Sequence, residues 1–215
     1  MTQTAFSSHA DPDGMLQYSR VLIEGARDLF GVTYLARLMA ELSVRPDALQ
    51  ADGVSPEAVW SGAEACAFPA VLERVFGARG GQGLAVRMGR LIFTRVLKRF
   101  GKTYGLMDRG FRLLPAPRRM ASGLAQLALI FNQQFHQHVT LEDAGTHWLW
   151  IVEDRPTCCQ ETAQSQGAAC YVIVGILQEF MTWSSGGRFY PVRELECSGS
   201  GGARCVFCVE KKPLD

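Results

Sequence analysis

The sequence has little charge imbalance, no leader-like start and no apolar run of membrane length. Its net charge is +1 at pH 7, so electrostatics give no reason to expect nucleic acid as a partner. Residues 1–14 are polar and lack the basic start and apolar run of a signal peptide. The longest apolar stretch, residues 168–183, is interrupted by Gln178 and Glu179 and is too short to span a bilayer. We therefore expect a cytoplasmic protein without a membrane span.

Signatures of catalysis are also missing. The glycines Gly80, Gly81, Gly83 and Gly89 suggest a phosphate loop, but no apolar strand precedes them and no Gly-Lys-Ser/Thr follows. Small residues that let two helices pack closely explain these glycines more simply. The sequence has no dinucleotide fingerprint and no flavin or iron–sulfur motif. These absences favour a binding protein over an enzyme.

Hydrophobic residues make up 47% of the 215 residues, which is enough for a sizeable core. Apolar residues recur at helical spacing until about His136, and afterwards they alternate as in strands. We expect an α+β fold in which an antiparallel sheet packs against helices, with one buried helix between the strands. The expected helices are 15–29, 33–43, 55–76, one ending near 100–101, 118–135 and 168–184, and the expected strands are 137–142, 146–153, 155–162, 188–197 and 204–211.

The same pattern predicts the domain organisation. Residues 1–14 should form a flexible tail, and residues 15–213 a single ligand-binding domain, helical over 15–136 and β-rich over 137–213. Gly31 should break the first helical stretch, and Pro69 should split or kink the third.

Six of the seven cysteines lie after residue 157. Their odd number and the lack of a secretion signal disfavour a disulfide framework. The adjacent pair Cys158 and Cys159 lacks the CxxC spacing of a redox pair, and neighbouring cysteines rarely form an unstrained disulfide. The role of this pair stays open. Cysteines that cluster in a protein of a reducing compartment indicate either metal binding or buried thiols.

Cys197 and Cys205 bracket a glycine-rich turn that could bring two thiolates together across a hairpin. Thiolates are good zinc ligands, and a structural zinc site needs four protein ligands. Cys170 could supply a third sulfur and Glu194 a carboxylate. In a regular strand, however, Glu194 and Cys197 would point to opposite faces, so a bulge or the approach to the turn would have to correct the geometry. Two buried free thiols near a turn are the alternative.

The stretch from Cys170 to Phe207 resembles the 4-vinyl reductase domain family of hydrocarbon-binding domains. The shared signature is an acid, a cysteine three residues later, a glycine in the turn, and a second cysteine followed by an apolar residue and phenylalanine. An upstream cysteine followed five residues later by glycine is also typical. The matching residues are Cys170, Gly175, Glu194, Cys197, Gly201 or Gly202, Cys205 and Phe207. The resemblance implies the fold of TRAPP subunits, a ligand-binding fold also used in NO signalling and Golgi transport.

The resemblance further implies a structural zinc ion held by Cys170, Glu194, Cys197 and Cys205. Four protein ligands leave no open position for an activated water, so metal-dependent hydrolysis is not expected. One residue more than the family pattern separates Cys170 from Glu194. If the register shifts accordingly, Glu196 would replace Glu194 as the acidic ligand.

A small-molecule site needs apolar and aromatic walls with a few polar groups. The resemblance implies that a tryptophan and a histidine hold the ligand's hydroxyl, which fits Trp148 or Trp150 and leaves His136 and His138 as candidates. For each aromatic residue, simple core packing is the competing interpretation. The predicted ligand-binding residues are Trp148, Trp150, Tyr171, Phe135, His136 and Phe180.

The sequence thus favours a non-catalytic domain that binds a small hydrophobic or aromatic molecule beside a structural zinc site. The alternative is an accessory or carrier protein for vinyl-group reduction in (bacterio)chlorophyll biosynthesis. In either case a separate signalling or biosynthetic partner protein would be needed. We also expect a homodimer through the N-terminal helices.

Overall fold

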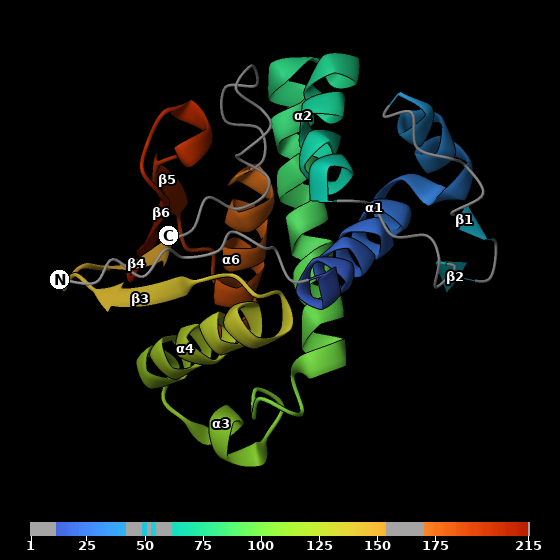
Figure 1. Ribbon diagram of the computed structural model, residues 1–215. Coiled ribbons are helices and arrows are strands. Elements are labelled where there is room, and N and C mark those ends of the chain that lie inside the picture. The colour runs from blue at the N-terminus through green and yellow to red at the C-terminus, as the bar shows by residue number, and fades with distance from the viewer. Residues whose placement is uncertain (1–11, 42–48, 51–52, 55–61, 154–169, 215) are drawn as a thin grey trace, which may run out of the picture.

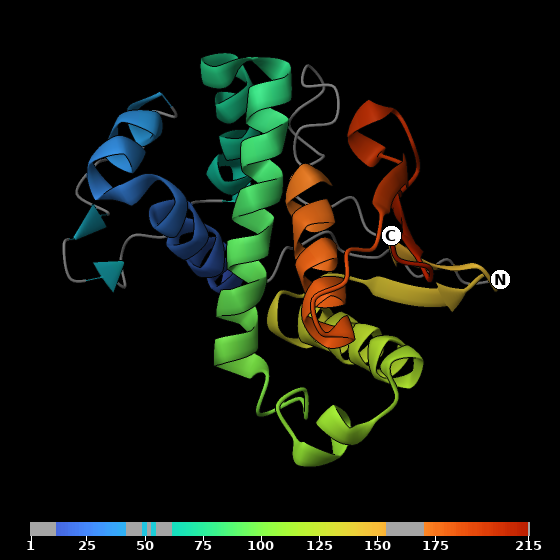
Figure 2. The same cartoon turned by 180° about the vertical axis from the view of Figure 1, so that it is seen from behind.

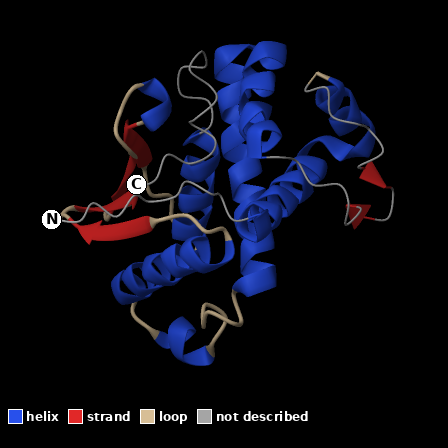
Figure 3. Ribbon diagram, in the orientation of Figure 1, coloured by secondary structure: helices blue, strands red, loops and turns tan. Residues whose placement is uncertain are grey.

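The computed structural model describes residues 12–41, 49–50, 53–54, 62–153 and 170–214. Within these ranges the chain forms an α+β fold in which helices dominate and a four-stranded antiparallel sheet packs against them (Figures 1 and 3). The predicted fold class is therefore confirmed. The elements are α1 (Pro12–Ala40), β1 (Leu49–Gln50), β2 (Gly53–Val54), α2 (Gly62–Phe100), α3 (Arg109–Leu113), α4 (Ala116–Gln134), β3 (Val139–Asp143), β4 (His147–Val152), α6 (Cys170–Ser185), β5 (Val192–Glu196), a 3-10 turn (Ser198–Ser200) and β6 (Cys205–Glu210).

The two long helices α1 and α2 each change direction at a glycine. Gly31 has φ 72° and ψ 163°, and Gly77 has φ 74° and ψ 161°, values that residues with a Cβ atom rarely adopt. The break at Gly31 confirms the prediction. In α2 the chain turns at Gly77 and not at Pro69, where the helix continues. After this turn Gly81 packs directly against the backbone of Leu72 and Glu73, so the two parts of α2 lie side by side (Figure 1).

The sheet has the strand order β3-β4-β6-β5, with every neighbouring pair antiparallel. Successive side chains of each strand point to opposite faces of the sheet. Trp150 and Phe207, which are paired across β4 and β6, both point into the core between the sheet and the helices. Viewed from front and back, α6 lies between the sheet and α2, and α4 crosses below it (Figures 1 and 2). The strongly apolar helix is therefore buried between the strands and the other helices, as predicted.

The predicted elements and the structure differ in a few places. The expected strand 155–162, the start of the expected helix 55–76, and Cys158 and Cys159 lie outside the described residues. The short helix α3 and the pair β1–β2 were not predicted. In the described part of the chain, no helix is both long and apolar enough to cross a membrane.

Candidate functional site

Three cysteines and one glutamate, from α6, β5, β6 and the residue that follows β5, converge at one end of the buried helix. The Sγ atom of Cys170 lies 3.5 Å from that of Cys197 and 3.8 Å from that of Cys205. One carboxylate oxygen of Glu194 joins them, and the four atoms all lie within 4.8 Å of one another. These are the four residues that the sequence predicted to come together.

A β-bulge makes this convergence possible. The pairing of β5 with β6 is regular from Val192 to Glu194 and shifts register between Glu194 and Glu196. Glu194 is paired with Phe207 and so shares its inward face. The extra residue in the bulge returns Cys197 to the same side. The bulge that is needed to bring Glu194 and Cys197 to one face of the sheet is therefore present.

Glu196, the alternative acidic ligand, has a different role. Its Oε1 atom accepts hydrogen bonds from the backbone N–H of Ala203 at 2.9 Å and of Arg204 at 3.4 Å. These bonds hold the turn that follows the 3-10 segment, where Gly201 adopts φ 95°. Glu194 is therefore the acid in the cluster, and Glu196 stabilises the turn.

The surroundings of the cluster shift the pKa values of two of its groups in opposite directions. Burial raises the pKa of Glu194 to about 8, although a hydrogen bond with Cys170 acts against this rise. The hydrogen bond with Cys170 lowers the pKa of Cys197 to about 6. Cys205 also accepts a hydrogen bond from the backbone N–H of Ser198, at 3.4 Å. The site thus favours a thiolate at Cys197, and Glu194 keeps its proton at neutral pH while no cation is bound.

A second group of interest lies where β4 packs against α4. Trp150 is fully buried, and its ring meets that of Phe131 edge to face, with centroids 5.4 Å apart. Phe131 in turn contacts Phe135 at 5.2 Å, and Phe135 contacts Tyr18 at 5.7 Å. In this apolar setting the indole Nε1–H of Trp150 has no hydrogen-bond partner in the described part of the chain.

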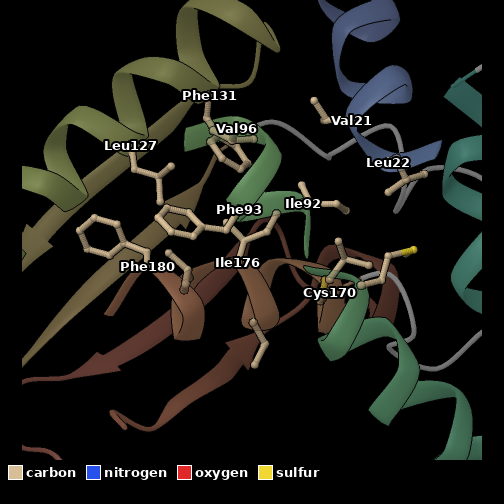
Figure 4. Close-up of a cluster of buried hydrophobic side chains, with 14 of the residues drawn as sticks. Val21, Leu22, Ile92, Phe93, Val96, Leu127, Phe131, Cys170, Ile176 and Phe180 are labelled. Atoms are coloured by element: carbon tan, nitrogen blue, oxygen red, sulfur yellow. The ribbon is translucent and has the colours of Figure 1, made fainter. Parts of the chain in front are cut away.

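The other predicted ligand residues lie outside the ring contacts around Trp150. Trp148 is buried, and the ammonium group of Lys211 lies 4.8 Å from its ring centroid at the sheet margin. Phe180 belongs to another aromatic group, 5.9 Å from Phe93 (Figure 4). Tyr171 is only partly buried, and His136 is exposed just after α4, with φ 51°. Of the six residues, only Phe135 and Trp150 join the same chain of ring contacts, linked by Phe131.

Comparisons with known proteins find the fold of this chain among solved structures. No family model matches the chain, and no curated protein matches it. Solved structures do match over nearly the whole chain. An oxygen complex of an oxygen-binding H-NOX domain related to soluble guanylate cyclases is 13% identical with a TM-score of 0.58, covering 94% of this chain and 97% of its own.

Two further solved structures support the same fold. An H-NOX protein from S. oneidensis in the Fe(II)NO ligation state is 10% identical with a TM-score of 0.56, covering 92% of this chain and 99% of its own. The phenol-responsive sensory domain of the transcription activator PoxR, with phenol, is 19% identical with a TM-score of 0.52, covering 70% of this chain and 74% of its own. At these identities the likeness shows the fold alone.

Two predictions from the sequence are corrected by these findings. The assignment to the 4-vinyl reductase family and to a TRAPP-like fold was wrong, since the matching structures are H-NOX domains and a phenol sensor. The prediction of zinc as the cofactor was also wrong, since the H-NOX structures of this fold are described with haem. Both errors came from a short motif, whereas the structural likeness involves most of the chain.

Proposed function

We propose that this chain is a non-catalytic sensory domain that binds a small aromatic molecule carrying a hydrogen-bond acceptor, and that Trp150 donates the hydrogen bond. The observation that carries this proposal is the unpartnered indole N–H of a fully buried tryptophan. A buried donor without a partner costs about 1–3 kcal/mol, so such donors are rare in folded proteins. A ligand oxygen that accepts from this N–H would remove that cost.

The surroundings of Trp150 define the chemical class of the ligand. Phe131 and Phe135 supply aromatic walls, and edge-to-face contacts with a further ring would be favourable. A phenol combines an apolar ring with a hydroxyl oxygen that can accept from the indole. The likeness to a phenol-responsive sensory domain supports the same class.

The packing of α4 suggests how binding would be transmitted. Phe131 and Phe135 both come from the C-terminal end of α4 and lie against Trp150 and Tyr18. A ligand that reaches the indole must displace these rings, so the bound state should favour a shifted α4. The displacement would also reach α1, because Tyr18 lies on that helix.

The experiment is isothermal titration of the purified chain with phenol and with toluene, two ligands of nearly equal shape. Only phenol has an oxygen for Trp150, so we expect it to bind about tenfold more tightly, as one hydrogen bond of about 1.4 kcal/mol would give. Equal affinities for the two ligands would refute the role of the indole. Failure of every phenol tested to bind would refute the proposed ligand class.

We further propose that Cys170, Glu194, Cys197 and Cys205 bind one metal ion that joins α6 to the β5–β6 hairpin. The convergence of three sulfurs and one carboxylate supports this proposal. Elemental analysis of the purified chain identifies the cation. Cys197→Ser should abolish its binding, whereas Cys208→Ser, which removes a buried thiol from the opposite face of the sheet, should leave the metal content unchanged.

Haem is a second candidate ligand because the H-NOX structures cover most of this chain. A haem iron held by histidine needs that residue inside the core. His136 and His138 are exposed, and His147 is half-buried in the β3–β4 hairpin, where it contacts Thr146. The histidines in the described ranges therefore do not fit this role. Addition of hemin to the purified chain tests the candidate, since specific ligation would give a sharp Soret band.

We also propose that residues 15–213 form a single domain and that the protein is a cytoplasmic homodimer that acts with a separate partner protein. Trp148, Tyr171, His136 and Phe180 are proposed as further ligand-binding residues. Light scattering of the purified chain tests the homodimer, and a strictly monomeric mass would contradict it.

A further inference from the structure

The connection between α2 and α4, with the helix ends on either side of it, carries a local excess of positive charge. We call residues 98–119 the basic tip. It contains seven lysines and arginines and one acidic residue, Asp108, whereas the rest of the chain has more acidic than basic residues. In Figures 1 and 2 this connection and α3 project from the end of the molecule farthest from the Cys170 end of α6. The near-neutral net charge of the chain hides this asymmetry.

The short helix α3 has one inward and one outward face. Phe111 is buried, and its ring stacks on that of Trp183 with centroids 5.9 Å apart. This contact fixes the orientation of α3. Arg109, Arg112 and Leu113, at helical spacings of three and four, are all exposed. The side of α3 that faces away from the core therefore presents two guanidinium groups and a leucine.

Leu113 is 76% exposed, more than any other large hydrophobic residue in the described ranges, and Met107, which precedes α3, is 41% exposed. An exposed leucine loses the stabilisation that burial would give it. Leu113 is the last residue of α3, and Met107 directly precedes its N-cap residue Asp108. Two apolar side chains thus stand among basic groups on a projecting loop.

Most of the cations in the tip are available for a partner. Arg99 forms an ion pair with Glu24 at 2.9 Å, and Arg119 donates to backbone carbonyls, including that of Ser184. By contrast Lys102, Arg109 and Arg118 are exposed, and none forms an ion pair with any residue that the structure describes. The same holds for Lys98 and Arg112. The positive charge is therefore not neutralised within the described chain.

We propose that the basic tip binds the surface of a membrane containing anionic phospholipids. The cations would lie among the headgroups, and Leu113 and Met107 would enter the boundary of the acyl chains. A nucleic acid fits less well, because proteins that hold single strands stack bases on exposed aromatic rings. The aromatic residues of the tip are turned inward: Phe111 packs on Trp183, and the hydroxyl of Tyr104 bonds to Gln133 at 2.9 Å.

The test is flotation of the full chain with vesicles of phosphatidylcholine alone or mixed with phosphatidylglycerol. We expect binding only to the mixed vesicles, weakened by added salt. The double variant Arg109→Glu/Arg112→Glu should reduce partitioning by at least about tenfold, since each basic residue near the surface contributes several-fold. Leu113→Ser should reduce it several-fold while retaining the dependence on salt.

Two matched controls keep the test specific. Arg87→Glu reverses an exposed charge on α2, roughly 20 Å along the helix from Lys102. Leu195→Ser removes a leucine that is 57% exposed on β5. Neither should change partitioning, and thermal melts should show all variants folded. Absence of binding to the mixed vesicles, or equal losses in the controls, would overturn the proposal. Binding of an oligonucleotide that is unaffected by Leu113→Ser, without vesicle binding, would assign the tip to nucleic acid instead.

Discussion

Gly89 of α2 and Gly175 of α6 face each other so closely that a Cβ atom on Gly89 would lie 2.9 Å from the Cα atom of Gly175. A Cβ atom on Gly175 would in turn collide with the carbonyl oxygen of Val86. The two helices therefore cross backbone against backbone. This crossing fixes α6 beneath the sheet, and so it positions both Cys170 and the core beside Trp150. Tight helix packing was the sequence-based interpretation of the glycine cluster, and for Gly81 and Gly89 it is confirmed.

The crossing predicts a sharp contrast between two glycine substitutions. Gly175→Ala should destabilise the protein by about 1–3 kcal/mol, because the methyl group can only fit if the helices separate. Gly83→Ala should be neutral or stabilise by about 0.5–1 kcal/mol, since it removes a flexible residue from a helix. A Cβ atom at Gly83 meets nothing within 4 Å. Urea unfolding measures both, and equal stabilities of the two variants would contradict the packing described.

A hydrogen-bonded ion pair joins α1 to α2. Arg95 donates from Nε to Asp28 at 2.8 Å and from Nη2 at 2.6 Å, and the bond with Asp28 raises the pKa of the guanidinium. Both side chains are about one third exposed. Arg95→Gln should therefore cost no more than about 1 kcal/mol of unfolding free energy.

The control for this pair is Arg74, whose contact with Glu41 is 3.5 Å long and more than half exposed on both sides. Arg74→Gln should have no measurable effect on stability, because such pairs are screened by water and salt. If Arg74→Gln lost more unfolding free energy than Arg95→Gln, the geometry of these ion pairs would not determine their strength.

The sequence predicted those features that depend on residues close along the chain. Helical and alternating patterns located the main helices and strands, and Gly31 marked a break. The spacing of Cys197 and Cys205 predicted that the two would meet across a hairpin. The bulge at Glu194 was needed for the acid to join them, and nothing in the local pattern shows a bulge directly. The helix α3 was missed because five residues are too few for a periodic signal.

The aromatic site was harder to predict because it is defined by a missing hydrogen bond, that of the Trp150 indole N–H. Trp150 was a candidate among several aromatic residues, and the sequence could not show which of them would lack a hydrogen-bond partner. That property depends on what β4, α4 and α1 bring together in space. His136 was a candidate because of the family resemblance, but the chain turns at this residue, which is exposed with its ring next to Gly14 of α1.

The Cys170 cluster predicts a pH dependence for the metal-free protein. Burial raises the folded-state pKa of Glu194 from 4.5 to about 8. The folded protein therefore binds this proton more tightly than the unfolded chain. The resulting stabilisation is complete below about pH 4.5 and is lost as the pH rises through 8. Cys197, with a lowered pKa of about 6, acts in the opposite direction: its contribution is present above the ordinary thiol pKa and is lost as the pH falls through 6.

The variant Glu194→Gln isolates the contribution of the carboxyl. In the presence of a chelator, wild type should lose stability relative to this variant between pH 5 and 8, as measured by the urea midpoint. The control Glu142→Gln, at an exposed position on β3, should follow the wild-type curve. If wild type and Glu194→Gln keep a constant difference across this range, the carboxyl is not buried as described.

The role of Trp150 is tested most directly by a thermodynamic cycle that pairs phenol and toluene with wild type and Trp150→Phe. Both ligands bring a ring, and both proteins keep an aromatic side chain at this position, so their differences isolate the indole N–H and the ligand oxygen. We expect the preference of wild type for phenol to disappear in Trp150→Phe and to persist in Trp183→Phe, which alters a tryptophan in the other aromatic group. An undiminished preference for phenol in Trp150→Phe would contradict the proposed function.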